Sequence, residues 1–74
     1  METSESKYAR FNILRYFAYK HLPEHLQAVS KPFSTLAYAT VDRCIHDKTI
    51  DPAEITVAVR KLLEAKDAAV RAMV

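Results

Sequence analysis

The sequence predicts an all-α fold, a small helical hairpin domain with an additional N-terminal helix. Apolar residues recur three and four positions apart over residues 33–44, and again between residues 55 and 73, as on one face of a helix. Between these segments, the sequence DPAE at residues 51–54 is typical of a helix start. We therefore expect one hairpin domain over residues 1–74, with residues 1–6 disordered.

The N-terminal helix is predicted over residues 6–20. Ile13, Leu14 and Phe17 fall on one side of it, and Phe11, Tyr16 and Tyr19 lie nearby. A helix of this length cannot bury apolar residues on several faces within so small a chain. The surplus predicts that this helix contacts a second subunit or a ligand.

The middle helix carries an apolar repeat that runs from Phe33 to Cys44. Pro32 lacks a backbone N–H and restricts Lys31 before it, which predicts either a kink or a fresh helix start at residues 30–32. A short helical turn over residues 23–29 precedes this point. The sequence HDKTID, residues 46–51, is the predicted loop of the hairpin.

The last helix is predicted from Pro52 to about Ala72. Asp51 can cap it, Pro52 suits the first helical position, and Glu54 can reach back as in a capping box. Its apolar stripe is Ile55, Val59, Leu62, Leu63, Ala69, Val70 and Met73. Oppositely charged residues four positions apart occupy the other side.

The length of 74 residues indicates one domain of marginal stability, since a chain this short buries only about 60% of its unfolded surface. The single cysteine, Cys44, excludes an internal disulfide and fits a reducing cytoplasm. Self-association remains as a source of stability, and we expect a compact homo-oligomer. The polar start METSESK predicts neither a signal peptide nor a membrane span.

The chain contains no glycine, which excludes a P-loop and a dinucleotide-binding fingerprint. We expect no cofactor. The net charge is only +2, too small to indicate a duplex DNA partner. The positive charge is nevertheless concentrated, because residues 7–31 contain five Lys/Arg and one acid. Such a local imbalance can attract an anion.

The same segment holds five of the seven aromatic residues. Nucleobases stack on such rings, and lysine or arginine binds phosphate, so Tyr16 with Arg15, Lys20 or Lys31 can hold a nucleotide without a glycine loop. The alternative is that these rings pack in a core or a subunit interface. Aromatic helices are common, and on the residues alone this alternative stays open.

Other sites have weaker support. His21 and His25 are four residues apart, but Pro23 lies between them and no third ligand follows, so no metal site is expected. Cys44 lies on the apolar face of its helix and is predicted to be a small buried residue. No Ser/His/Asp or Cys/His set indicates catalysis, and the protein is not predicted to be an enzyme. A helix-turn-helix regulator would need a basic last helix, but acids match the bases there.

In four segments taken together, the sequence resembles a family of small phage-encoded anti-defence proteins. These are the aromatic segment YFAYKHLP, the segment SKPFSTLA, the helix start DPAEI and the closing helix VRKLLEAKDAAVRAM. Members of the family sequester the cyclic nucleotides of bacterial CBASS immunity, and their hairpin domain also occurs in sponges for Thoeris signals. The family's tryptophan-and-asparagine stretch before the last helical turn is absent from this sequence, which reads AKDAAVRA there.

The resemblance implies a homo-oligomer, typically a hexamer, acting in the cytoplasm of an infected bacterium. It implies that cyclic dinucleotides bind between subunits, with Tyr16 as the stacking ring and Lys31 as the phosphate ligand. A second site, for cyclic trinucleotides, would use Thr35 and Arg71. Two other functions remain open: a helical oligomerisation or protein-interaction module that binds no nucleotide, and a small DNA-binding regulator.

Overall fold

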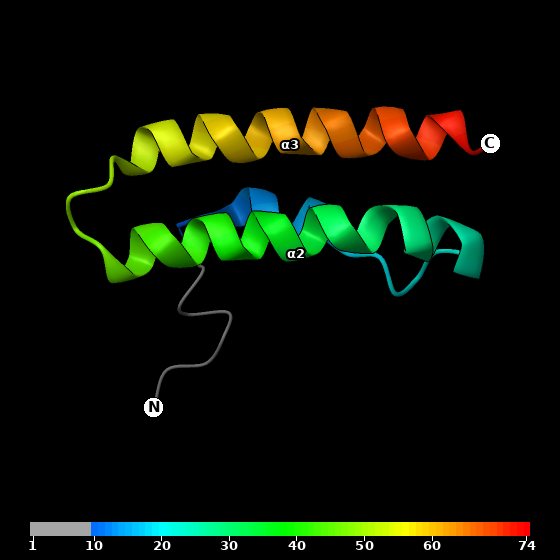
Figure 1. Ribbon diagram of the computed structural model, residues 1–74, viewed down its shortest axis with the longest axis horizontal. Helices are drawn as coiled ribbons and strands as arrows, with labels where there is room; N and C mark the ends of the chain where they lie inside the picture. Colours follow the sequence, from blue (N-terminus) through cyan, green and yellow to red (C-terminus); the bar gives the residue numbers. More distant parts are fainter. Residues whose placement is uncertain (1–9) are drawn as a thin grey trace.

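The computed structural model describes residues 10–74, which form one short 3₁₀ helix and two long α-helices. These are η1 (Asn12–Phe17), α2 (Glu24–His46) and α3 (Pro52–Ala72). Figure 1 shows α2 and α3 side by side in opposite directions, and η1 contacts both of them. Residues 10–74 contain no strand, so the predicted all-α hairpin with an additional N-terminal helical element is confirmed.

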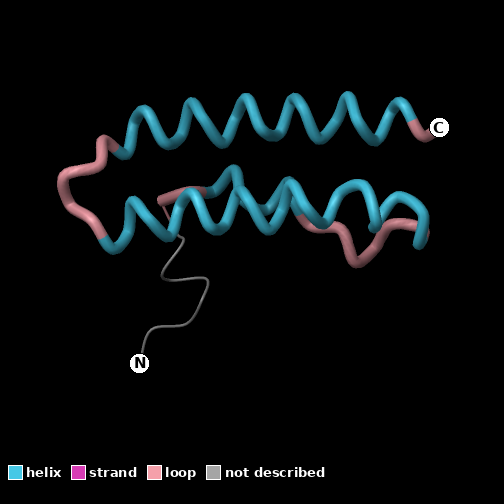
Figure 2. The backbone as a smooth tube through the Cα atoms, in the orientation of Figure 1, coloured by secondary structure: helices cyan, strands magenta, loops and turns pink. Residues whose placement is uncertain are grey.

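The last helix has the predicted bounds because its start is specified locally. An Asp51 side-chain oxygen accepts a hydrogen bond from the Ala53 N–H at 2.9 Å, and Pro52 occupies the first turn. Only half of the predicted capping box forms, since the Glu54 side chain makes no hydrogen bond within residues 10–74. The hairpin loop lies between His46 and Pro52, as predicted, and is drawn in pink in Figure 2.

At Pro32 the structure decides between the two predicted alternatives, because α2 is one helix with Pro32 inside it. The predicted turn over residues 23–29 is its first part, and a fresh helix start at residues 30–32 is wrong. A proline inside a helix removes one backbone hydrogen bond and costs about 3 kcal/mol. A continuous stripe of buried residues on both sides of Pro32 stabilises the helical path, from Ser30 and Ser34 to Ala37, Val41 and Cys44.

The first element also differs from the prediction. Residues 6–9 of the predicted helix lie outside the described residues, and the rest of the segment forms only the 3₁₀ helix η1. Phe11, Leu14 and Phe17 are three positions apart. A 3₁₀ helix has three residues per turn, so this spacing places all three on one side. All three are at most 3% exposed.

The core lies where η1 packs against the hairpin. Its buried apolar residues are Phe11, Leu14, Phe17, Ala37, Val41, Cys44 and Val59. Cys44 is 4% exposed, which confirms its predicted burial. The apolar surplus expected on the first segment is therefore largely absorbed within the chain. Tyr16 is the exception, with 54% of its surface exposed.

The hairpin loop is stabilised by Asp47. Its carboxylate accepts hydrogen bonds from the Thr49 hydroxyl at 2.6 Å and from the Thr49 N–H at 3.0 Å. The hydroxyl bond contributes most, and together they hold the pKa of Asp47 below its usual value of 3.8. The charged form of Asp47 thus stabilises the fold above pH 3.8, and this contribution disappears as the pH falls through the folded pKa.

We predict that Val59→Ala lowers the melting temperature far more than Val57→Ala. Val59 is fully buried, whereas Val57 on the same helix is 38% exposed. Losing two buried methyl groups costs about 1.5 kcal/mol of transfer free energy, and the cavity adds to this. Thermal unfolding followed by circular dichroism measures both variants. Equal melting temperatures for the two would show that α3 does not face η1 through Val59.

We also predict that Thr49→Val raises the pKa of Asp47 towards 3.8, because it removes the hydroxyl donor. NMR titration of the carboxyl carbon measures this value. Thr35→Val makes the same chemical change far from the loop and should leave the pKa of Asp47 unaltered. An unchanged pKa in Thr49→Val would mean that the hydroxyl is not the cause.

Candidate functional site

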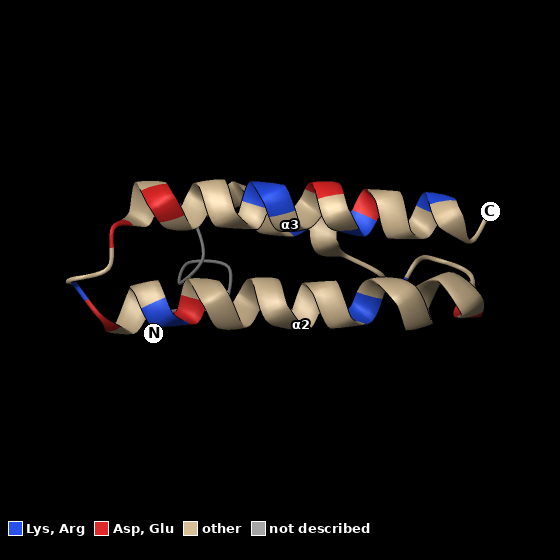
Figure 3. Ribbon diagram, turned by 45° about the horizontal axis from the view of Figure 1, so that its top comes forward, with Lys and Arg blue, Asp and Glu red and all other residues tan. Residues whose placement is uncertain are grey.

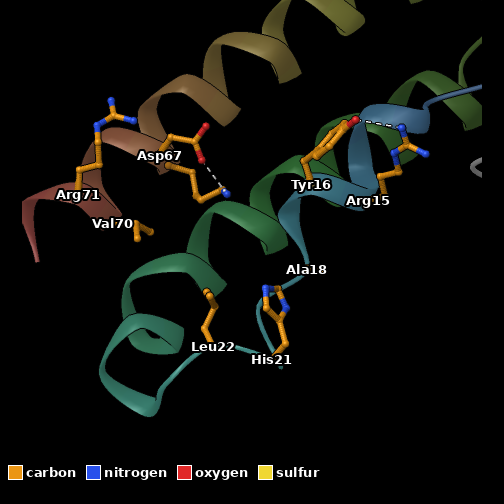
Figure 4. Close-up of a pocket in the computed structure, with 9 residues that line it drawn as sticks. Arg15, Tyr16, Ala18, His21, Leu22, Asp67, Val70 and Arg71 are labelled. Atoms are coloured by element: carbon orange, nitrogen blue, oxygen red, sulfur yellow. Dashed lines mark hydrogen bonds and ion pairs between the residues drawn. The ribbon is translucent and has the colours of Figure 1, made fainter. Parts of the chain in front are cut away.

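A groove lies between the segment that follows η1 and the C-terminal part of α3. Its volume is about 390 Å³. We call it the η1–α3 groove, and Figure 4 shows its lining side chains. The polar side chains that line it are Arg15, Tyr16, His21, Lys66, Asp67 and Arg71. This groove brings an exposed aromatic ring and several bases together.

Tyr16 is held by its neighbour in the chain. Arg15 donates a hydrogen bond from Nη2 to the Tyr16 hydroxyl at 2.9 Å. The guanidinium carbon also lies 4.9 Å from the centre of the Tyr16 ring, a cation–π contact. Because the guanidinium covers one face of the ring, a nucleobase can stack only on the other face. The same contact keeps a positive charge beside the ring, where a phosphate would need it.

The groove carries an excess of positive charge. Lys66 forms an ion pair with Asp67 at 2.8 Å, and this pair is partly buried on the lysine side. Arg15 and Arg71 pair with no acid within residues 10–74. Elsewhere on α3 the acids and bases alternate, as Figure 3 shows. The groove thus contains two arginines without an acid partner and one carboxylate, Asp67, which is paired with Lys66.

Lys31 and Thr35 lie elsewhere, on the side of α2 that faces away from the core. They line a shallow groove of about 490 Å³ with Ala28, Pro32, Leu36 and Ala39, which we call the α2 outer groove. Lys31 is helical within α2, so the expectation that Pro32 restricts its backbone is wrong. Leu36 is 54% exposed there.

Within one chain, the four candidate ligand residues thus form two pairs. Tyr16 lies with Arg71 in the η1–α3 groove, and Lys31 lies with Thr35 in the α2 outer groove. The resemblance had paired Tyr16 with Lys31 and Thr35 with Arg71. None of the four grooves described for residues 10–74 contains either of those combinations. Tyr16 and Lys31 therefore line different grooves of one chain.

His21 and Ser34 were not among the ligand residues predicted from the sequence. Both line a third groove of about 450 Å³ between residues 14–21 and α2, together with Tyr19, Lys20 and Tyr38. Ser34 and Tyr38 are four positions apart on α2 and therefore lie on the same side of the helix. This spacing is the sequence signal that could have indicated Ser34. The sequence alone does not place the segment after η1 against that side of α2.

The described residues offer little metal or nucleophile chemistry. No group of three or more His, Cys, Asp or Glu side chains in residues 10–74 could hold a metal ion. His21 lies in the connection before α2 and His25 in its first turn. The thiol of Cys44 is buried, 3.9 Å from the carbonyl oxygen of Ile50.

The chain matches no model of a known protein family, and no curated protein or solved structure is significantly similar to it. None of the helices described for residues 10–74 is long and apolar enough to cross a membrane.

Proposed function

We propose that this protein binds and sequesters cyclic oligonucleotides without cleaving them, as an anti-defence protein of a phage in the cytoplasm of the infected bacterium. One observation carries the proposal: the exposed ring of Tyr16 lines one groove together with Arg15 and Arg71, which pair with no acid within residues 10–74. A flat ring and free positive charge are the two features that bind a base and its phosphate.

The separation of the candidate residues gives the site its proposed geometry. Tyr16 and Arg71 of one copy supply one half, and Lys31 and Thr35 of another copy supply the other. A cyclic dinucleotide has two bases and two phosphates related by an approximate two-fold axis. Such a ligand suits a site shared by two identical subunits. A cyclic trinucleotide would need a third contact of the same kind.

The α2 outer groove supports the self-association that this arrangement needs. Its lining is mainly apolar, and the exposed Leu36 lies within it. We propose that a second copy covers this surface in a compact oligomer, a hexamer by analogy with the family. In this proposal the self-association surface is α2, because Leu14 and Phe17 of η1 are already buried within the chain.

A second candidate function is favoured by the same surface. A chain that presents an apolar helix face can act as an oligomerisation or protein-interaction module with no nucleotide ligand. The two candidates differ in what the η1–α3 groove does, since only the first assigns a ligand to it.

We predict that Tyr16→Ala and Lys31→Glu each weaken binding of cyclic dinucleotides while the assembly stays intact. Loss of one stacked base costs roughly 1–3 kcal/mol, which corresponds to a roughly 5- to 150-fold weaker affinity. Charge reversal at Lys31 places a carboxylate against a phosphate and should abolish binding. Isothermal calorimetry with a panel of cyclic di- and trinucleotides measures both effects. Lys61→Glu, on α3 outside the grooves described, is the matched control.

Parental affinity in both variants would overturn the assignment of these residues. Ligand released by heating the complex must be chemically intact, because a cleaved product would contradict sequestration. If no cyclic nucleotide binds at all, the interaction-module function is the one that remains.

We also predict that the purified protein has a mass several times that of one chain, measured by light scattering at micromolar concentration. Leu36→Glu should reduce this mass, because it places a charge on the surface that a second copy covers. Val57→Glu introduces the same charge at another exposed apolar position and should not reduce it. A single-chain mass for the parent protein would remove the basis for a site between subunits.

A further inference from the structure

The third groove has a composition of its own. It lies between residues 14–21 and α2, has a volume of about 450 Å³, and is called the connector groove here. Arg15, Ala18 and His21 line it on one side and also line the η1–α3 groove. The segment from Arg15 to His21 is therefore a wall between two separate grooves.

Two rings line the connector groove, Tyr19 from the wall and Tyr38 from α2. Tyr38 is 37% exposed, and Tyr19 is half-buried. The charged residues in the lining are Arg15 and Lys20, with His21 beside them, and the lining contains no carboxylate. The η1–α3 groove, in contrast, contains Asp67. The connector groove thus combines aromatic surface with uncompensated positive charge within one chain.

The segment from Arg15 to His21, which forms one wall of the groove, is held in place by contacts within the chain. The Gln27 side-chain amide donates to the Leu22 carbonyl oxygen at 2.8 Å and lies 3.4 Å from that of Lys20. This single side chain ties the segment after η1 to the first turns of α2. Leu14 and Phe17, at its other end, are held in the core. Because both ends of the segment are anchored, the backbone at Tyr19 and Lys20 loses little further conformational freedom when a ligand binds.

A polar group lies in the opposite wall. Ser34 is 7% exposed and lines the groove from α2. Within residues 10–74 its hydroxyl has no hydrogen-bond partner. The Ser34 oxygen is not among the fully buried unpaired side-chain atoms of residues 10–74, so it stays accessible to a ligand in the groove.

We propose that the connector groove is a binding site for a single nucleotide, a ribonucleoside 5′-monophosphate. Its base lies against the rings of Tyr19 and Tyr38, its phosphate lies towards Lys20 and Arg15, and the Ser34 hydroxyl hydrogen-bonds to it. The volume is at the small end of ligand pockets, which suits one nucleotide. The site is complete within one chain and does not rest on the proposed sequestration of cyclic oligonucleotides.

The test is a titration of the ¹⁵N-labelled full chain with AMP, followed in ¹H–¹⁵N NMR spectra. We expect saturable shifts at Lys20, Ser34 and Tyr38. Adenosine lacks the phosphate and ribose 5-phosphate lacks the base, so each should bind at least about tenfold more weakly than AMP. Tyr19→Ala and Lys20→Glu should each weaken AMP binding about fivefold or more, whereas Tyr19→Phe should retain it.

Arg71→Glu, in the other groove, is the control and should leave AMP binding unchanged. If Tyr19→Ala lowers the melting temperature, Lys20→Glu decides instead, because Lys20 is exposed. The proposal is overturned if AMP causes no saturable shifts, or if ribose 5-phosphate binds as tightly as AMP, which indicates an unspecific anion patch. Shifts confined to residues 66–71 would also overturn it.

A parallel titration with a cyclic dinucleotide separates the two proposals. Shifts at Tyr16 and Lys31 support sequestration between copies, and AMP shifts at Ser34 support the connector site, so either proposal can fail while the other stands.

Discussion

The packing of Phe11, Leu14 and Phe17 against the hairpin is the interaction on which the rest of the structure depends. Two antiparallel helices alone bury only the stripe along which they touch, and Val59 is the single fully buried residue described on α3. Phe11, which precedes η1, and Leu14 and Phe17 within it fill the space beside both helices. Burying side chains of this size contributes roughly 1.5–3 kcal/mol each, a large share of the stability of so short a chain.

That packing also creates the grooves. Once Phe17 is fixed in the core, the chain must run back along the hairpin to reach Glu24, and Gln27 holds this return segment by its carbonyl groups. The segment is too narrow to fill the space on both of its sides. One side opens towards the end of α3, and the other opens towards the middle of α2. The tyrosine and basic side chains of residues 15–21 therefore line these two grooves. A longer helix would have distributed the same side chains around its surface.

The distribution of charge gives the grooves a common chemistry. Along α3 acids and bases alternate, so their fields largely cancel (Figure 3). The return segment holds Arg15, Lys20 and His21 without an acid between them. The outer side of α2 is different again, with one lysine on a mainly apolar surface. A chain with a net charge of only +2 therefore has two grooves that contain several bases and a third that is mainly apolar.

The sequence by itself determined the features that depend on neighbouring residues. The bounds of α3 followed from Asp51 and Pro52, which act on the first turn alone, and the burial of Cys44 followed from helical periodicity. The tertiary structure decided the features that depend on distant contacts. Core packing holds α2 in one helix through Pro32, and it selects a 3₁₀ turn for Phe11, Leu14 and Phe17. The candidate residues were recognisable as residue types, but their grouping into grooves depends on where the return segment lies. Gln27 and the core fix that position, and no local sequence pattern encodes it.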